Sequence, residues 1–376
     1  MSAVQRVAIA GAGIAGLASA ILLAEDGVEV DVYEIKPELS ALGSGITLQG
    51  NALRSFARLG IWDEVQAKCW SSDRLGLRAP GPDAPVIAVI PDAKTGGPDF
   101  PAAAGMYRPD LAQIMLDRAT SLGARVHYGI VVDALTQDAD GVDLTLSDGS
   151  TARVDLLIGA DGLNSAVRTM IGIDVKPEPT GMGIWRAFVP RPKEVTHTDL
   201  YYGGPMYIAG YCPTSDAMMY AYLVEDKQDR TAVTPEQAIE IMRESSRAYG
   251  GPWEQIRESL GADSRVNYTW FTSHLIDGPW NRGRVVLIGD AAHSCPPTIA
   301  QGGAQAAEDA LVLCDILARA TAVDDAGWDE FTRRRLDRAR TIVEASLQLG
   351  QWQLDHVQGD VPGLMGRIAA LTSVPA

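Results

Sequence analysis

The sequence feature that most constrains the fold lies in the first 34 residues, where an apolar segment runs into a glycine-rich motif. Residues 4–10 are typical of a buried strand, residues 14–26 of a helix that Gly27 ends, and residues 29–33 of a second strand. Strand, helix and strand in this order predict a βαβ unit. Such a unit implies a parallel sheet with helices on its faces, and therefore an α/β fold.

The glycine motif between the first strand and the helix reads Gly11-Ala-Gly13-Ile14-Ala15-Gly16. Gly11 permits a tight turn, Gly13 lets the backbone approach a pyrophosphate, and Gly16 allows close packing of helix on strand. Free N–H groups at the helix start then face the diphosphate, and Glu34, which ends the second strand, can accept hydrogen bonds from ribose hydroxyls. The pattern predicts a dinucleotide site and does not distinguish FAD from NAD.

The same segment permits two other interpretations. Val7 to Ala24 is an 18-residue stretch without a charge, preceded by Arg6, which is also typical of a signal peptide and approaches the length of a membrane span. The glycines argue against both, because they lie where a strand would turn into a helix and the next strand follows at once. We therefore expect no membrane span and a cytoplasmic protein.

Charge and cysteine content exclude further classes of protein. The formal net charge of −16 repels phosphate backbones, so nucleic acid is not an expected partner. Cys69, Cys212, Cys295 and Cys314 are far apart, with no C-x-x-C pair and no nearby histidine pattern. We expect no disulfide and no metal site, as is usual in a reducing cytosol.

The chain changes character in its middle part. Between about residues 175 and 275, short aromatic-containing segments alternate with Pro and Gly, which predicts antiparallel strands at 183–189, 206–211, 218–224 and 267–272 and a helix near 235–248. Residues 284–288 return to the buried-strand pattern, and residues 303–320 predict a long helix. We expect a discontinuous first domain (1–75, 100–174 and 276–345), an inserted, mostly antiparallel sheet domain (76–99 and 175–275) and a helical segment at 346–376.

Two further motifs follow apolar strands. In Leu156-Leu-Ile-Gly-Ala-Asp161-Gly162, taken alone, Asp161 is better explained as the cap of a following helix. In Val285-Val-Leu-Ile-Gly289-Asp290, the aspartate can bond a ribityl hydroxyl. A helix start at Gly302 to Ala304 offers N–H groups to the pyrimidine edge of an isoalloxazine ring, where reduction places negative charge. The alternative is a capped helix with a rigid entry loop.

In order and spacing, the three motifs closely resemble those of the group A flavoprotein monooxygenases, the para-hydroxybenzoate hydroxylase family. The resemblance spans Val7 to about Arg340 and is greatest with compact single-component hydroxylases of salicylate-type and hydroxynicotinate-type acids. It implies a Rossmann-like, GR2-type FAD-binding domain with an inserted substrate domain, tightly bound FAD, and NAD(P)H as a transient co-substrate. The presence of one clean GxGxxG motif agrees with a family that needs no second nucleotide domain.

The resemblance also assigns cofactor contacts. The segment from Gly43 to Asn51 is similar to the family's loop beside the flavin, and Arg108 is similar to an arginine that contacts the cofactor. The set expected to bind FAD is Gly11, Gly13, Ile14, Ala15, Gly16, Glu34, Ile35, Lys36, Gly45, Ile46, Arg108, Val132, Asp161, Gly289, Asp290, Pro297, Gly302, Gly303 and Ala304.

For the substrate wall the resemblance points to aromatic strands of the inserted domain. Tyr207 and Tyr211 are four residues apart, which on a strand would place them on one face, and Tyr220 and Tyr222 share a face of the next strand. Each tyrosine alone is more simply explained as a core residue. Arg186 could pair with a substrate carboxylate, or it could belong to a structural ion pair.

Two positions near the flavin complete the catalytic candidates, which are Tyr207, Tyr211, Thr47 and Pro297. Thr47 stands where relatives often have His, Arg or Gln, and its hydroxyl is no base of comparable strength. Pro297 is expected to shield the flavin as a rigid apolar group. His293 is expected to pack beside the flavin loop rather than to act as a base.

The implied reaction is reduction of FAD by NAD(P)H, addition of O2 to give a C4a-hydroperoxide, and transfer of one oxygen atom to a small electron-rich aromatic ring. A related flavin epoxidase or reductase acting on a non-aromatic substrate is the alternative, as is a non-catalytic FAD-binding protein. A halogenase is disfavoured because Trp185-Arg-Ala-Phe-Val-Pro190 lacks that class's second tryptophan. A homodimer is the common outcome in the family.

Overall fold

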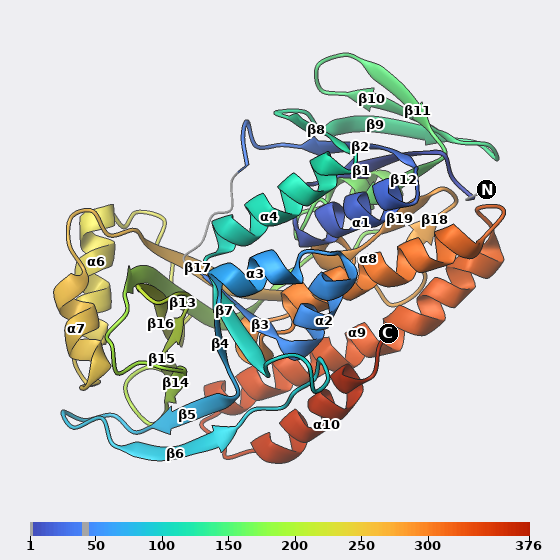
Figure 1. The fold of residues 1–376 in the computed structure, drawn as a ribbon. Coiled ribbons are helices and arrows are strands. Elements are labelled where there is room, and N and C mark those ends of the chain that lie inside the picture. The colour runs from blue at the N-terminus through green and yellow to red at the C-terminus, as the bar shows by residue number, and fades with distance from the viewer. Residues whose placement is uncertain (1–2, 40–44) are drawn as a thin grey trace.

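The computed structural model describes residues 3–39 and 45–376, which build two large sheets and two small ones (Figure 1). The first large sheet has the order β18-β19-β12-β1-β2-β8 and is parallel except at β18. Its strands are β1 (Arg6–Ala10), β2 (Glu29–Glu34), β8 (Arg125–Tyr128), β12 (Leu156–Gly159), β18 (Asn281–Arg282) and β19 (Val285–Leu287). The expected βαβ unit and the return of the chain to this sheet are confirmed.

Helices cover the parallel sheet. Helix α1 (Ile14–Glu25) packs against α4 (Arg108–Ser121) and α8 (Gly302–Arg319), and residues 15–23 of α1 are all buried because helices and sheet surround it. The other helices of this part are α2 (Gly50–Arg58), α3 (Trp62–Lys68) and α5 (Ala166–Met170). Helix α1 has only 12 residues, and no helix within the described ranges is both long and apolar enough to cross a membrane.

The long helix α9 (Asp325–Leu354) is held against α8 by buried charges. Arg335 donates to Asp309 at 2.6 Å and to Glu308 at 3.1 Å, and Arg338 donates to Glu308 at 2.7 Å. Loss of one partner would leave an uncompensated buried charge, so the network fixes the position of α9. Helix α10 (Val361–Ser373) follows along the lower edge of the molecule in Figure 1.

Two small sheets complete the part of the chain around the parallel sheet. One is the antiparallel sheet of β9 (Val132–Gln137), β10 (Val142–Leu146) and β11 (Thr151–Val154). The other joins β3 (Ile46–Gln49), β7 (Ala103–Met106) and β4 (Trp70–Ser72). It carries Thr47, and it lies between the parallel sheet and the second large sheet in Figure 1.

The second large sheet has the order β20-β17-β13-β16-β15-β14-β5-β6 and is antiparallel except between β14 and β5. Its strands are β5 (Arg74–Arg78), β6 (Val86–Pro91), β13 (Glu178–Pro190), β14 (Thr198–Tyr201), β15 (Ile208–Pro213), β16 (Met218–Asp226), β17 (Val266–Leu275) and β20 (His293–Ser294). Residues 74–91, far away in sequence, thus join the strands of the middle part.

The two faces of this sheet have different surroundings. Helices α6 (Pro235–Ser245) and α7 (Pro252–Ser259) cover one face and form a core with the inward side chains. The helix predicted at 235–248 is therefore present but ends at Ser245. Because side chains alternate along a strand, every second residue points to the opposite face, which is turned toward the parallel-sheet half of the molecule. Two short 3-10 helices, η1 (Gly289–Ala291) and η2 (Pro297–Ile299), lie on that side.

Candidate active site

A cavity of about 2740 Å³ extends between the carboxyl ends of the parallel strands and the open face of the eight-stranded sheet. Pockets for drug-sized ligands measure roughly 300–1,000 Å³, so this cavity can hold more than one such ligand. Its wall includes Gly13, Ile14 and Ala15 on one side and Tyr220 and Tyr222 on the other. The structure thus brings the glycine motif and the tyrosines of the middle part to one space.

The glycine motif has the backbone that a diphosphate site requires. Gly11 has a φ of +101°, and a Cβ there would lie 2.3 Å from the carbonyl oxygen of Ala160. A Cβ on Gly16 would lie 2.0 Å from the oxygen of Gly11, so neither position tolerates a side chain. A Cβ on Gly13, in contrast, would meet no atom within 4 Å and would project into open space beside the helix start. The loop therefore fits the pyrophosphate of FAD.

The carboxylate of Glu34 holds this loop in place. It accepts hydrogen bonds from the backbone N–H groups of Ala12 and Lys36, both at 2.9 Å. Each oxygen keeps a lone pair for a further donor such as a ribose hydroxyl. Ile35 is 69% exposed and Val132 is only 4% exposed, and neither lines the cavity. Their expected contact with FAD stays a prediction.

In the Asp161-Gly162 motif, the aspartate side chain bonds to the start of the following helix. Asp161 accepts hydrogen bonds from the Ser165 hydroxyl and from the N–H of Val167, so its carboxylate caps α5, while its neighbours Ala160 and Gly162 line the cavity. Asp161 itself is not among the residues that line the cavity, and its expected contact with FAD stays a prediction.

Arg168 follows the Asp161-Gly162 motif and connects it to the motif that ends in Gly289-Asp290. Its guanidinium donates to the carbonyl oxygens of Leu163 and Ala291, both at 2.9 Å, and faces Nε2 of His274 at 3.3 Å. Because arginine can only donate, the facing nitrogen of His274 is an acceptor and the proton is on Nδ1, beside Ser294. Burial and the charge of Arg168 lower the pKa of His274 to about 4.

The motif that ends in Gly289-Asp290 turns at Gly289, where φ is +58°. The N–H of Gly289 and the ring of His293 both bond to one oxygen of Asp309 at 2.8 Å. His293 is thus tied to the buried charge network, in agreement with a packing position and not with a general base. Asp290 lines the cavity, where desolvation by the surrounding protein raises the pKa of its carboxyl.

The remaining expected FAD contacts divide into two groups. Gly45, Ile46, Arg108, Pro297, Gly302 and Gly303 line the cavity. Ala304 is 2% exposed and Gly289 is buried, and both lie behind that wall. Gly43 and Ser44 of the proposed flavin loop lie outside the described residues. Arg108 begins α4 and, like Asp290, lines the cavity, where its charge partly offsets the rise in the pKa of the Asp290 carboxyl.

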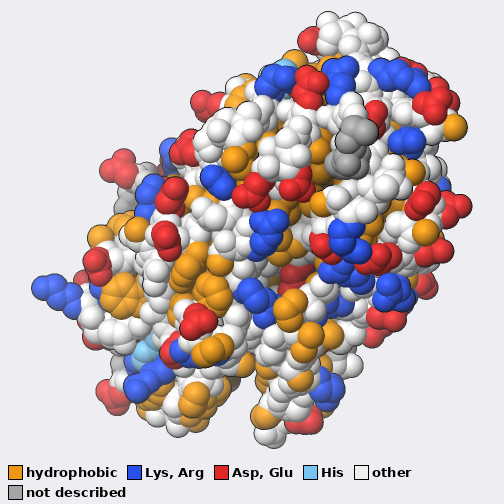
Figure 2. Space-filling view, turned by 45° about the vertical axis from the view of Figure 1, so that its right-hand side comes forward, with side chains coloured by type: hydrophobic (Ala, Val, Ile, Leu, Met, Phe, Trp, Pro, Cys, Tyr) orange, Lys and Arg blue, Asp and Glu red, His pale blue; other side chains and the backbone are white. Residues whose placement is uncertain are grey.

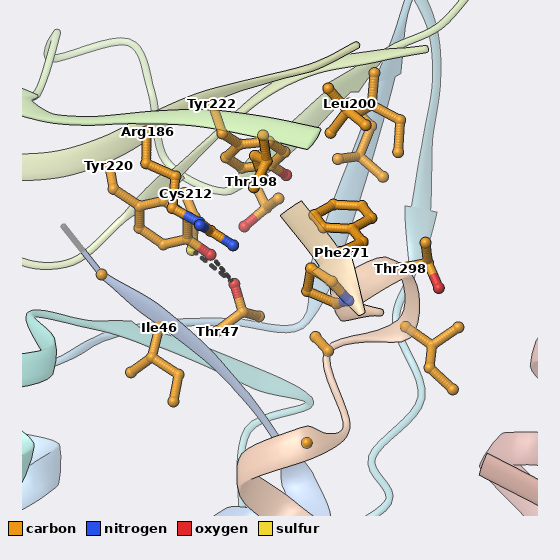
Figure 3. A pocket seen from close by; sticks show the side chains of 18 of the residues that line it. Ile46, Thr47, Arg186, Thr198, Leu200, Cys212, Tyr220, Tyr222, Phe271 and Thr298 are labelled. Atoms are coloured by element: carbon orange, nitrogen blue, oxygen red, sulfur yellow. Dashed lines mark hydrogen bonds between the residues drawn. The ribbon is translucent and has the colours of Figure 1, made fainter. Parts of the chain in front are cut away.

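On the substrate side, cross-strand register brings the polar groups into rows. Tyr220 pairs with Phe188 and with Cys212, and Tyr222 pairs with Arg186. All of them line the cavity. Thr47, from β3, donates a hydrogen bond toward the sulfur of Cys212 at 3.6 Å and is also hydrogen-bonded to the Tyr220 hydroxyl, as Figure 3 shows.

Arg186 has no carboxylate partner among the described residues. Its guanidinium donates to the Thr269 hydroxyl at 2.8 Å and otherwise faces the cavity beside Tyr220 and Tyr222 (Figure 3). Desolvation lowers the pKa of this guanidinium. The structural ion pair considered from the sequence is therefore wrong, and the cation is left available to an anionic ligand.

One of the sequence-predicted tyrosines does not reach the cavity. Tyr211 is 0% exposed and packs in the core under α6 and α7, with its hydroxyl donating to Asp199. Tyr207 lines the cavity, and its hydroxyl donates to Asp226 at 2.6 Å. The expectation that the two share a strand face is wrong because β15 begins at Ile208, so Tyr207 precedes the regular alternation.

Sequence reasoning missed several residues of the site. Phe188 lines the cavity and stacks on Tyr107, with ring centroids 4.4 Å apart. The cavity is also lined by Cys212, Thr198, Leu200 and Phe271. Three of these labelled side chains surround Tyr222 in Figure 3, namely Thr198, Leu200 and Phe271. The signal that could have found Phe188 is the alternation on β13, where it shares a face with Arg186.

Comparison with known proteins agrees with this site. Residues 5–346 match the family described as FAD binding domain. The aurachin C monooxygenase/isomerase of Stigmatella aurantiaca is 30% identical over 356 residues, covering 92% of this chain and 90% of that protein. The 6-hydroxynicotinate 3-monooxygenase of Bordetella bronchiseptica is 29% identical over 370 residues, covering 92% and 91%.

Solved structures give the same picture of the fold. The crystal structure of Klebsiella pneumoniae HpxO complexed with FAD and uric acid superimposes with a TM-score of 0.85 at 24% identity, covering 99% of this chain and 97% of that one. At this identity the match establishes the shared fold. The family match extends over most of the chain, and the cavity wall it includes carries the three motifs. The chain therefore belongs to the FAD-binding domain family and is an FAD-dependent monooxygenase of the para-hydroxybenzoate hydroxylase type.

Proposed function

We propose that the enzyme hydroxylates a small, electron-rich aromatic or heteroaromatic ring that carries an anionic group. The observation that carries this proposal is the position of Arg186, a desolvated cation without a carboxylate partner in the described chain, beside the hydroxyl pair of Thr47 and Tyr220. Arginine binds carboxylates through two parallel hydrogen bonds, which would fix the orientation of a ring acid.

The hydroxyl pair gives the ring hydroxyl a hydrogen-bond acceptor. Thr47 has one hydroxyl proton, which it donates toward Cys212, so its oxygen accepts from Tyr220. The oxygen of Tyr220 is then free to accept a hydrogen bond from a phenolic or hydroxypyridine hydroxyl. Burial raises the pKa of Tyr220, so this residue stays neutral and orients the ring hydroxyl as its acceptor. Thr47 acts here by orienting the Tyr220 hydroxyl and not as a base.

Apolar groups keep water away from the reacting atoms. The stacked rings of Phe188 and Tyr107 close one side, and Pro297 presents a rigid apolar surface on the side of the glycine pair. FAD, when bound, supplies oxygen-transfer chemistry with a reductant and O2. Gly13, Glu34, Arg108, Asp290 and Gly302 are the residues that we propose hold it, and NAD(P)H is the proposed reductant, acting without a nucleotide domain of its own.

The relatives support a planar, oxygen-substituted ring as substrate. One of them is a 6-hydroxynicotinate 3-monooxygenase, whose name specifies a hydroxypyridine acid. A panel of phenolic and hydroxypyridine acids, scored for stimulated NAD(P)H oxidation and for product mass, tests the proposal. Product heavier by one oxygen atom supports it. Stimulated oxidation with a reduced or epoxidised non-aromatic product would favour the related epoxidase or reductase instead.

We also propose the domain division expected from the sequence, with 1–75, 100–174 and 276–345 as the FAD-binding domain and 76–99 and 175–275 as the substrate domain. Support comes from the membership of β5 and β6 in the eight-stranded sheet. Limited proteolysis with and without FAD tests it: FAD should protect sites in the first set of segments more strongly than sites in the second.

We propose a cytoplasmic homodimer as the working form. The cysteines Cys69, Cys212, Cys295 and Cys314 are free, as suits a reducing compartment, and a homodimer is the common outcome in the family. Light scattering coupled to gel filtration gives the mass in solution, and a monomer at micromolar concentration would contradict the dimer. Fractionation of native cells tests the compartment.

A further inference from the structure

The cavity continues well beyond the groups that would hold an aromatic ring. Two cross-strand rows cross the open face of the eight-stranded sheet toward its edge, since residues in register point to the same side. One row consists of Phe188, Tyr220, Cys212, Thr198, Leu75 and Ile90, and the other of Arg186, Tyr222, Gly210, Leu200, Leu77 and Ala88.

The chemistry changes along these rows. They are polar or aromatic on β13 and β16, carry Thr198 and Leu200 on β14, and are aliphatic on β5 and β6. Leu200, Leu77, Leu75 and Ile90 all line the cavity. Neighbouring strands lie about 4.8 Å apart, so β16 and β6, separated by four strand intervals, are about 19 Å apart. The last interval, about 5 Å, runs over aliphatic side chains only, and Leu200 extends this aliphatic surface to β14.

These aliphatic groups are accessible rather than packed. Leu75, Leu77 and Leu200 are only partly buried, and Ile90 is 40% exposed. Val357, between α9 and α10, and Val361, the first residue of α10, also line this cavity and are 56% and 38% exposed. Contiguous exposed apolar surface of this kind marks a binding site.

This aliphatic part of the cavity opens at the end of the molecule remote from the glycine motif. In Figure 1, β6 and α10 form the lower edge, whereas β1 and α1 lie near the top. Figure 2, turned about the vertical axis, shows hydrophobic side chains on both sides of an indentation at this lower edge. Polar groups, Arg74 and Asp92, lie at one end of β5 and β6 and form part of the rim.

We propose that the substrate carries an apolar substituent on its aromatic ring, and that this substituent lies in the channel formed by Leu75, Leu77, Ile90 and Leu200 and by Val357 and Val361. The inference rests on the proposed function, because the ring is placed by Arg186 and Tyr220. The aliphatic side chains of this channel are continuous with the ring site and match a hydrocarbon chain.

The test uses the FAD-loaded enzyme and 2-hydroxybenzoates with alkyl groups of increasing length, from methyl through propyl to pentyl, with the point of attachment varied around the ring. Binding is followed by perturbation of the bound flavin's absorption, and hydroxylation by product mass. For one point of attachment, each added methylene should tighten Kd by about threefold to fourfold. Affinity that falls with chain length at every point of attachment would overturn the proposal.

Two variants of the channel and one control variant locate the alkyl chain. Ile90→Gln, on the channel side of β6, should reduce the gain per methylene to below about twofold, as should Leu77→Gln. Ile87→Gln, on the opposite face of β6 and 64% exposed, should keep the wild-type gain. An unchanged gain in Ile90→Gln and Leu77→Gln contradicts the channel.

The same measurements separate the two proposals. If unsubstituted 2-hydroxybenzoate and its methyl derivatives are hydroxylated but longer chains bring no gain, the channel is wrong and aromatic hydroxylation stands. If neither these probes nor the wider panel of phenolic and hydroxypyridine acids yields an oxygenated product, the proposed function fails and the inference fails with it.

Discussion

The hydroxyl groups of Thr47 and Tyr220 are hydrogen-bonded to each other although 173 residues separate them in the chain. Thr47 lies on β3, at the flavin side, and Tyr220 on β16, in the sheet that we propose binds the substrate. The bond therefore joins the two halves of the active site at the point where the ring hydroxyl would sit.

Tyr220→Phe removes the acceptor that we place against the substrate hydroxyl. Product formation should fall by about 10- to 100-fold, since loss of a buried hydrogen bond costs about 1–3 kcal/mol. FAD should stay bound, and NAD(P)H oxidation should continue with release of peroxide. Oxygen uptake and product yield, measured together, give the degree of uncoupling, and tightly coupled turnover in the variant would contradict this role of Tyr220.

Tyr211→Phe is the matched control, because Tyr211 lies on the other face of the same sheet and donates to Asp199. Loss of a buried hydrogen bond should lower the free energy of unfolding by about 1–3 kcal/mol. The ratio of product to NAD(P)H consumed should equal that of the wild type. Thermal unfolding with the coupling assay separates the two effects.

Arg186→Met should weaken binding of anionic ring substrates by about 10- to 100-fold, since hydrogen bonds to charged groups contribute roughly 1.5–3 kcal/mol. The methyl ester of the same ligand should bind equally to both proteins. Because Arg186 is desolvated and has no carboxylate partner in the described chain, the ligand-free variant should be at least as stable as the wild type. Equal weakening for acid and ester would argue against the anion site.

Gly13 and Gly11 should respond differently to substitution. Gly13→Glu projects a negative charge into open space at the proposed diphosphate site, so FAD affinity should drop by about 100-fold or more while the apoprotein melts as before. Gly11→Ala places a methyl group 2.3 Å from the oxygen of Ala160 at a φ of +101°, so it should destabilise the apoprotein by about 1–3 kcal/mol. Flavin titration and calorimetry of both apoproteins test the pair.

His274 should make stability depend on pH. Its pKa in the folded protein is lowered from 6.5 to about 4, so unfolding takes up a proton between these values. The free energy of unfolding should therefore fall as pH decreases from about 6.5 to 4, by about 3 kcal/mol in total. Urea unfolding across this window measures it. In His274→Gln the slope should be smaller, and an unchanged slope would assign it to other groups.

Secondary structure and turns were predictable where the residues of one short segment determine its conformation. The βαβ unit follows from residues 4–34 because apolar periodicity and three glycines fix strand, turn and helix within one stretch of chain. The order of the motifs pointed to FAD for the same reason, since each is a strand end followed by a turn or a helix start. Residues such as Val132 and Ile35 had no comparable local signal, and they do not reach the cavity.

By itself, the sequence determined that Gly11, Gly13 and Gly16 form a dinucleotide turn and that Tyr220 and Tyr222 share a strand face. Only the tertiary structure decided which face meets the cavity. A shift of one residue in strand register reverses the direction of every side chain, and the start of β15 at Ile208 turned Tyr211 into the core. The pairing of β5 with β14, across more than a hundred residues, likewise placed Leu75 and Leu77 beside Thr198 and Leu200, because sheet pairing depends on complementary surfaces and not on proximity in the chain.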